Sequence, residues 1–220
     1  MNVLRSLLVV VGISLAVSSP AAADPTLNLT IDDHVGIGFD VDVNAPAGTG
    51  LVSYNGVIGS WNVNFASGVG VPSISSSEID LNSINVTNGA GSHHLTIVLT
   101  QTGSSLATGL ALFTAVNALG GTSPDIAWLA CIDSACSSGG SHTGSLLGFS
   151  ANDGWAGSIL DASNFTLRII IDIFHTGPQA TSFNSNLLLA SVQRLPEPGS
   201  LVLLVATLLG FVAAGRRRRR

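Results

Sequence analysis

The sequence predicts an all-β protein, an antiparallel β-sandwich of jelly-roll-like or immunoglobulin-like type, between two terminal segments of different character. Three observations predict this arrangement: apolar and polar residues alternate over much of the middle of the chain, glycine- and serine-rich clusters separate these runs, and both ends carry apolar stretches. Alternation with a period of two is typical of strands that bury one face. We therefore expect a signal peptide at 1–23, an extracytoplasmic β-sandwich at 24–194 and a sorting segment at 195–220.

Residues 1–23 have the three parts of a secretory signal peptide. Arg5 supplies the positive charge, residues 7–17 are apolar or small, and residues 21–23 are alanines that give the small-x-small pattern of a cleavage site. A permanent N-terminal anchor is the alternative, but the apolar run is only about half of the roughly 20 residues that span a bilayer. Cleavage by signal peptidase is expected between Ala23 and Asp24.

The middle of the chain contains ten segments with strand patterns. The strongest is 165–174, where alternate residues from Phe165 to Ile173 form one apolar face, so this strand is predicted to be central. Residues 106–119 also suit a short amphipathic helix, and the sequence leaves both possibilities open. The predicted strands are 27–31, 37–43, 61–65, 78–86, 94–100, 110–116, 126–132, 146–150, 165–174 and 185–192.

The charge of the middle segment differs from that of the whole chain. The formal net charge is −5, yet five of the eight basic residues lie at the extreme C-terminus and the chain has no lysine. Between 24 and 194 the only lysine or arginine residues are Arg168 and Arg194, against a large excess of acids. Nucleic-acid binding depends on neutralising phosphates, so no nucleic-acid partner is expected. A cation, a neutral glycan or a basic partner stays compatible with this charge.

The two cysteines, Cys131 and Cys136, lie close together in a segment expected to be exported, where disulfides persist. We expect them to form a disulfide at the tip of a hairpin, which closes only a small loop and contributes modestly to stability. A structural zinc site needs about four ligands, and two thiols with a distant His142 do not supply them. A redox pair would more usually have the spacing Cys-x-x-Cys.

No catalytic residue, cofactor or metal ion is predicted from the sequence. His93 and His94 are adjacent, so their side chains would lie on opposite faces of a strand and would not easily share a metal ion. Asp40 and Asp42 would lie on one face of a strand, near Asp32, Asp33 and His34, and such oxygens could form part of a calcium site. The simpler interpretation is a solvated polar face. Paired carboxylates could also serve a glycosidase, but one strand without a cleft supports that only weakly.

The three tryptophans could form a platform for sugar rings. Trp61 and Trp128 occur within strand patterns and are expected in the core. Trp155 follows Asn152-Asp153-Gly154 in an apparent loop and is the best candidate for an exposed aromatic ring.

The C-terminal segment has a tripartite order. Pro196, Glu197 and Pro198 come first, residues 201–215 are apolar or small except Thr207, and the chain ends in Arg216, Arg217, Arg218, Arg219 and Arg220. The prolines favour an extended, accessible strip. The apolar part would be about 22 Å long as a helix, short against a hydrocarbon core of about 30 Å, so flanking residues must help it to span. The arginines are expected to stay in the cytoplasm and to place the middle segment outside.

This order of parts resembles the PEP-CTERM sorting signal of Gram-negative bacteria, over about the last 25 residues of the chain. The resemblance implies processing at Pro196-Glu197-Pro198 by an exosortase, a membrane-embedded cysteine transpeptidase of organisms that make extracellular polysaccharide. It also implies a transient stay in the inner membrane, followed by the cell surface or the extracellular space. A permanent single-span anchor is the alternative. Residues 79–86 and 95–100 resemble a β-region of uncharacterised PEP-CTERM proteins and imply no activity.

Two function classes follow from these features. The favoured one is a non-enzymatic surface or extracellular-matrix protein, associated with extracellular polysaccharide or biofilm. The alternative is a secreted glycan-active enzyme on a β-sandwich scaffold. Because sandwiches host both classes, fold alone does not decide between them; the missing acid–base constellation favours the first.

Overall fold

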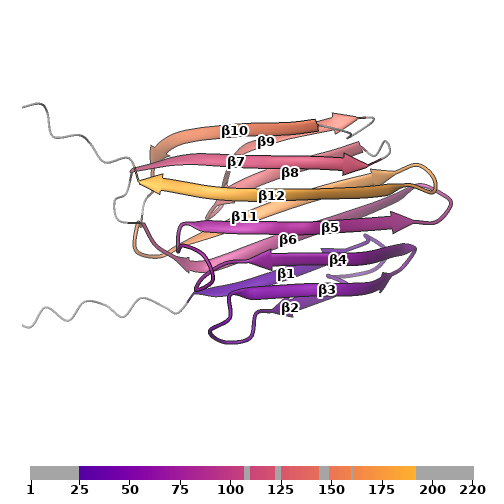
Figure 1. Ribbon diagram of the computed structural model, residues 1–220, viewed down its shortest axis with the longest axis horizontal. Helices are drawn as coiled ribbons and strands as arrows, with labels where there is room; N and C mark the ends of the chain where they lie inside the picture. Colours follow the sequence, from indigo (N-terminus) through magenta and orange to yellow (C-terminus); the bar gives the residue numbers. More distant parts are fainter. Residues whose placement is uncertain (1–24, 107–109, 122–124, 144–148, 160, 192–220) are drawn as a thin grey trace, which may run out of the picture.

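The computed structural model describes residues 25–106, 110–121, 125–143, 149–159 and 161–191. Within these residues the regular structure consists of twelve strands, and no helix is long and apolar enough to cross a membrane. The strands run side by side as two layers (Figure 1). Their bounds are β1 Thr26–Asp32, β2 Val41–Asn44, β3 Leu51–Ile58, β4 Trp61–Val69, β5 Glu78–Asn88, β6 His93–Ser104, β7 Leu110–Gly121, β8 Asp125–Ile132, β9 Ala135–Thr143, β10 Phe149–Ser158, β11 Phe165–His175 and β12 Ala180–Ser191.

The twelve strands form two six-stranded antiparallel sheets. Sheet A has the order β2-β1-β6-β11-β8-β9, and sheet B has the order β10-β7-β12-β5-β4-β3. Strands far apart in sequence are neighbours in both sheets, as in the β11–β6 pair, where Ile171 is opposite Ile97. The prediction of an all-β antiparallel sandwich is confirmed, and β11 lies inside sheet A as its apolar pattern predicted.

The core lies between the two sheets and consists of the alternate residues of each strand. On β11, the inward residues from Phe165 to His175 are at most 2% exposed, whereas the residues between them are half-buried or exposed. Burying an isoleucine or leucine side chain contributes about 1.5–3 kcal/mol, so these rows stabilise the sandwich more than any surface contact does. Trp61 and Trp128 belong to this core, at 1% and 7% exposed, as the sequence predicted.

Residues 37–40 were expected to continue a strand, and this prediction is wrong. Only Val41–Asn44 forms β2, while Ile37 and Phe39 are exposed outside regular structure. Gly36 and Gly38 have φ angles of 146° and 92° in this segment. Such positive values interrupt an extended strand despite the alternating residue pattern.

The glycine- and serine-rich segment after the cysteines is a strand, β9, although its composition predicted a loop. Its glycines allow close packing on β8: a Cβ atom on Gly140 would lie 2.5 Å from the Trp128 ring, and one on Gly139 would lie 2.6 Å from the Leu129 side chain. Glycine is therefore needed where side chains of two large residues on the neighbouring strand closely approach the β9 backbone.

Three further segments differ from the sequence-based expectation. β3 was not predicted. Residues 110–121 form β7, and so the helix alternative for 106–119 is wrong for this part. Of the strand expected at 146–150, residues 149 and 150 belong to β10 and residues 146–148 lie outside the described part. β10 includes the segment around Trp155 that was expected to be a loop. Strand pairing with β7 outweighs the turn preference of Asn152-Asp153-Gly154.

Cys131 and Cys136 form a disulfide across the tip of the β8–β9 hairpin, with Cα atoms 4.0 Å apart. The tip is also held to β11, because the Asp133 amide donates to the Thr166 carbonyl (2.8 Å) and the Thr166 amide donates to the Asp133 carboxylate (2.9 Å). The disulfide and these two hydrogen bonds together fix the hairpin tip against the sheet.

Candidate functional site

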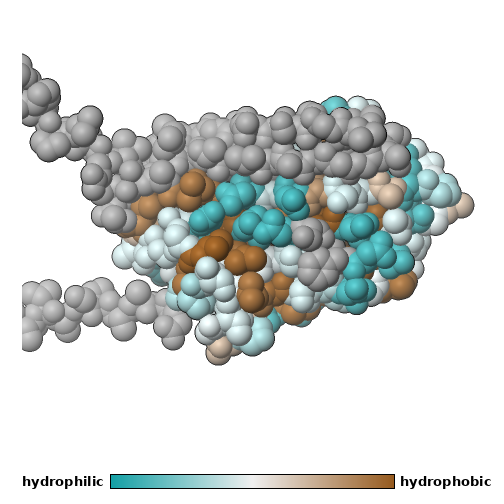
Figure 2. All heavy atoms as spheres, in the orientation of Figure 1, coloured by the Kyte–Doolittle hydropathy of each residue, from teal (hydrophilic) through white to brown (hydrophobic). Residues whose placement is uncertain are grey.

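The outer face of sheet A brings together polar and charged side chains of β1, β2, β6 and β11. Outward residues come from the same strands that supply the core, because alternate residues point to opposite faces. On the opposite side of the sandwich, hydrophilic and hydrophobic residues are interspersed over β3, β4 and β5 (Figure 2). The outer face of sheet A is therefore the candidate site.

A polar row crosses four strands of this face. Asn44, Asn28, Thr100 and Arg168 are neighbours in the register of β2, β1, β6 and β11. Asn28 Nδ2 donates to Asn44 Oδ1 (3.1 Å) and to Asp42 Oδ1 (2.5 Å). No ion pair or side-chain hydrogen bond joins Arg168 to another described residue, so its guanidinium donors can bind a ligand. We call Asn44, Asn28, Thr100 and Arg168 the polar row.

An apolar strip lies beside the polar row. Val98, Ile170 and Leu129 are neighbours on β6, β11 and β8, and Leu129 is 40% exposed. The face therefore presents apolar and hydrogen-bonding side chains next to one another.

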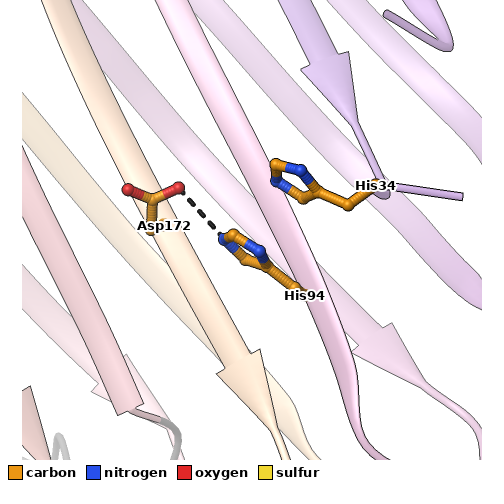
Figure 3. Close-up of side chains that lie close together, drawn as sticks. All are labelled: His34, His94 and Asp172. Atoms are coloured by element: carbon orange, nitrogen blue, oxygen red, sulfur yellow. Dashed lines mark hydrogen bonds and ion pairs between the residues drawn. The ribbon is translucent and has the colours of Figure 1, made fainter. Parts of the chain in front are cut away.

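A histidine cluster, His34, His94 and Asp172, lies further along the same face (Figure 3). His94 Nε2 lies 3.1 Å from Asp172 Oδ1, and the His94 ring stacks between those of His34 (3.8 Å between centroids) and Phe174 (4.0 Å). The Thr96 hydroxyl donates to Asp172 Oδ1 (2.5 Å) and lies 2.7 Å from His34 Nε2. The cluster thus brings together the segment after β1 with strands β6 and β11.

His93 and His94 lie in different environments, as their adjacency on a strand predicted. His93 contacts the Ser60 hydroxyl (2.8 Å) and the Ala90 carbonyl (2.9 Å), whereas His94 contacts Asp172. A depression of about 380 Å³ lies beside them. It is lined by Ser92, His93, His94, Asp125, Phe174, His175 and Thr176.

The acidic residues considered for calcium separate into two groups. Asp40 is not on a strand with Asp42, so the expectation of a shared face is wrong; Asp42 binds Asn28 instead. Asp32, Asp33 and Asp40 do approach one another, with one carboxylate oxygen of each within 4.8 Å. Their carboxylates accept hydrogen bonds from backbone amides of residues 33–35, and these bonds shape the loop after β1.

The tryptophans do not form a described sugar platform. Trp61 and Trp128 are buried, and Trp155 belongs to β10, with a side chain outside the described part. The exposed aromatic side chains that the structure does describe include Phe39 (58%) and Phe174 (40%). The sequence pattern had placed Phe174 on the second face of its strand, which was the available indication that it could be exposed.

A buried polar network lies on the inner side of β11, directly behind Phe174. His175 Nδ1 donates to Asn88 Oδ1 (2.6 Å), and His175 Nε2 accepts from the Thr181 hydroxyl (2.7 Å). Asn88 Oδ1 also accepts a hydrogen bond from the backbone amide of Gln179, so this atom is the carbonyl oxygen of the side chain. His175 must therefore donate to it, which places the imidazole proton on His175 Nδ1. Burial first, and the nearby His93 second, lower the pKa of His175 to about 4. This histidine is therefore neutral at pH 7.

A cleft of about 640 Å³ has no titratable side chain in its lining. It lies where β1 begins, next to the loops after β2 and β4, and so it lacks groups for acid–base chemistry. Its lining is Pro25, Thr26, Leu27, Asn44, Ala45, Pro46, Ala47, Gly48, Gly50, Val71 and Pro72.

The remaining predicted site residues lie outside the described part of the chain. These are the expected cleavage position between Ala23 and Asp24, the Pro196-Glu197-Pro198 motif and the terminal arginines.

Comparison with known proteins gives no family. No family model and no curated protein matches the chain. Among solved structures, the chain is similar to TmCBM61 in complex with β-1,4-galactotriose, with 11% identity, a TM-score of 0.34 and coverage of 62% of this chain and 92% of that one. It is also similar to the family 11 carbohydrate-binding module of Clostridium thermocellum in complex with a β-1,3-1,4-mixed-linked tetrasaccharide, with 12% identity, a TM-score of 0.25 and coverage of 73% and 95%.

A third similar structure is that of infectious bursal disease virus, Gx strain, with 10% identity, a TM-score of 0.26 and coverage of 87% of this chain and 55% of that one. At such low identities and TM-scores, these similarities assign neither a ligand nor an activity to this chain.

Proposed function

We propose that this chain is a non-enzymatic, exported surface or extracellular-matrix protein that associates with a neutral extracellular polysaccharide through the outer face of sheet A. The observation that carries the proposal is the polar row beside the apolar strip. The asparagine, threonine and arginine side chains of the polar row offer hydrogen-bond donors and acceptors at fixed spacing. Val98, Ile170 and Leu129 offer an apolar surface that crosses the three neighbouring strands β6, β11 and β8.

The charge of the domain supports a neutral rather than an anionic glycan. Acids greatly outnumber lysine and arginine between 24 and 194, and an anionic polymer would be repelled by the summed field. Neutral sugar hydroxyls can instead accept from the donors of Arg168 and donate to the side-chain carbonyl oxygen of Asn28, and hydrogen bonds to a charged group are the stronger ones.

Replacing Arg168 by alanine is expected to weaken binding to neutral exopolysaccharide by roughly tenfold or more, because a hydrogen bond to a charged group contributes about 1.5–3 kcal/mol. Affinity electrophoresis and calorimetry against a panel of neutral and anionic polysaccharides measure this effect. Asn62→Ala is the control, since Asn62 is an exposed residue of β4 in the other sheet. Equal losses in both variants, or tighter binding of anionic polymers, would contradict the proposed surface.

Export and sorting form the second part of the proposal. Signal peptidase removes residues 1–23, residues 201–215 and the terminal arginines hold the chain transiently in the inner membrane, and an exosortase cuts at Pro196-Glu197-Pro198. The mature domain then reaches the cell surface or the extracellular space. This part rests on the resemblance of the last 25 or so residues to the PEP-CTERM signal.

Glu197→Ala is expected to abolish processing, so that uncleaved protein accumulates in the inner membrane. The apolar segment and arginines are unchanged in this variant, so insertion should persist while recognition of the motif is lost. Mass spectrometry of the C-terminal peptide measures the outcome, and Ser200→Ala, just outside the motif, is the control. Arg216 still attached to mature wild-type surface protein would contradict sorting and favour a permanent anchor.

A further inference from the structure

We propose that His34, His94 and Asp172 form a binding site for a transition-metal ion on the outer face of sheet A, and that Zn²⁺ is the ion it binds. This inference goes beyond the proposed glycan association and does not depend on it. This site was not predicted from the sequence, because Asp172 lies 78 residues after His94 along the chain.

The three side chains already bring their donor atoms together. One donor atom from each of His34, His94 and Asp172 lies within 4.8 Å of the other two. The distance of 3.1 Å between His94 Nε2 and Asp172 Oδ1 is close to the edge of about 3.3 Å that a tetrahedral zinc site has, since zinc–nitrogen and zinc–oxygen bonds are about 2.0–2.1 Å long. Two of the three donors therefore need little movement to bind one ion.

The sheet positions these two donors firmly. Asp172 is opposite Thr96 in the β11–β6 register, and His94 is opposite Phe174. Phe174 stacks on one face of the His94 ring at 4.0 Å, which holds the imidazole in place next to the carboxylate. A site built on paired strands is more rigid than one built on loops alone.

The Thr96 hydroxyl lies where the three donors converge. It is 2.5 Å from Asp172 Oδ1, 2.7 Å from His34 Nε2 and 3.4 Å from His94 Nε2. A hydroxyl has a single proton, which goes to the carboxylate, so its oxygen accepts the Nε2 proton of His34. A cation at this convergence would take over the bridging role of the hydroxyl and bind the same three atoms directly. The Nε2 proton of His34 would then move to Nδ1 or to solvent, because a ligating nitrogen must be unprotonated.

His34 is the ligand that must move. Its ring is nearly parallel to that of His94, at an interplanar angle of 10°, and one ion cannot lie in the planes of two parallel stacked rings. His34 can turn because it is an exposed residue on the segment that follows β1, outside the ladder. Metal binding is therefore expected to separate the two imidazole rings while the His94–Phe174 stack persists.

The ligand set favours a transition metal over calcium. Imidazole nitrogen suits zinc, copper and nickel, whereas calcium prefers six to eight oxygen ligands. Two histidines and one carboxylate leave a fourth tetrahedral position for water or an external ligand. The nearby carboxylates of Asp32, Asp33 and Asp40 lower the cost of bringing a cation to this end of the face.

Titration of the metal-free, full 220-residue chain with Zn²⁺ tests the proposal. The chain is purified in detergent through a tag that contains no histidine, and Co²⁺ serves as a second, spectroscopic probe. We expect one ion per chain and the visible absorption of a tetrahedral cobalt site. His34→Ala, His94→Ala and Asp172→Asn should each weaken binding by more than about tenfold, since even the loss of a residue that only orients a ligand typically costs about 10- to 100-fold.

His93→Ala is the matched control, because His93 is the neighbouring histidine of the same strand but contacts Ser60 and Ala90. It should bind Zn²⁺ as the wild type does. The isosteric Asp172→Asn variant, with far-ultraviolet circular dichroism as the check on folding, separates ligand loss from misfolding. Binding no tighter in the wild type than in His94→Ala, or an equal loss in His93→Ala, overturns the site. If Arg168→Ala loses glycan binding but still binds Zn²⁺, the proposed metal site is supported independently of the proposed glycan surface.

Discussion

Replacing Ile171 by alanine is expected to lower the free energy of unfolding of the β-sandwich by about 2–5 kcal/mol. Ile171 is 1% exposed and faces the core from the middle of sheet A, with Ile97 and Trp128 opposite it on the two neighbouring strands. Truncation removes apolar contact and leaves a cavity that the paired strands cannot close. Because a whole domain is stable by only about 5–15 kcal/mol, the effect is large.

Urea unfolding of residues 24–195, followed by circular dichroism, measures this loss, and Ile170→Ala is the matched control. Ile170 is the same residue type one position earlier on β11, but it is half-buried on the outer face. Its truncation should cost about 1 kcal/mol or less. Similar losses in the two variants would mean that both faces of β11 are covered, or that the strand is shifted by one residue, since such a slip exchanges its two faces.

The alternation of apolar residues was sufficient to predict the central strands. β6 and β11 keep a strict period of two over most of their length, and both faces appear where the pattern placed them. The edge strands were harder to predict because pairing there does not need a buried apolar row. β9 has the composition of a loop, yet Gly139 and Gly140 are the residues that fit beneath Leu129 and Trp128.

The candidate site was less predictable than the fold. Its polar row depends on the register of four strands, which places Arg168 beside Thr100 and Thr100 beside Asn28. No spacing along the chain encodes this order. The calcium hypothesis grouped residues that are close in sequence. In the structure, Asp40 belongs to the loop after β1, whereas Asp42 lies on β2 and accepts a hydrogen bond from Asn28. His34, in the same loop, contacts Thr96 on β6.

Acidification is expected to destabilise the sandwich through His175 between about pH 6.5 and pH 4. This side chain is 1% exposed, and both its nitrogens are engaged by Asn88 and Thr181 in the neutral form. Burial, with a smaller contribution from His93, lowers the pKa of His175 from 6.5 to about 4. A second proton would have to bind Nε2, which already accepts the hydrogen bond from Thr181. The resulting charge would be buried against the Trp61 ring, whose centroid lies 4.7 Å from that of His175.

The sign of the effect follows from proton binding in the two states. The unfolded chain protonates this histidine near pH 6.5 and the folded chain only near pH 4, so between these values the unfolded state binds more protons and stability rises with pH. The contribution is complete above about pH 6.5 and is lost as the pH falls through the folded pKa. At about 1.4 kcal/mol per pKa unit, the total is roughly 3 kcal/mol.

Comparison of the wild type with His175→Gln isolates this contribution. Asp80 acts in the opposite direction, because burial raises the pKa of its carboxyl, and that group is present in both proteins. The free energy of unfolding, measured by urea titration from pH 4 to pH 7.5, should rise with pH less steeply in His175→Gln than in the wild type. Ile171→Ala is the control for destabilisation as such: it should lower the whole curve and keep it parallel to that of the wild type, because no titrating group is removed. A curve for His175→Gln that is parallel to that of the wild type would show that the acid sensitivity arises at other groups.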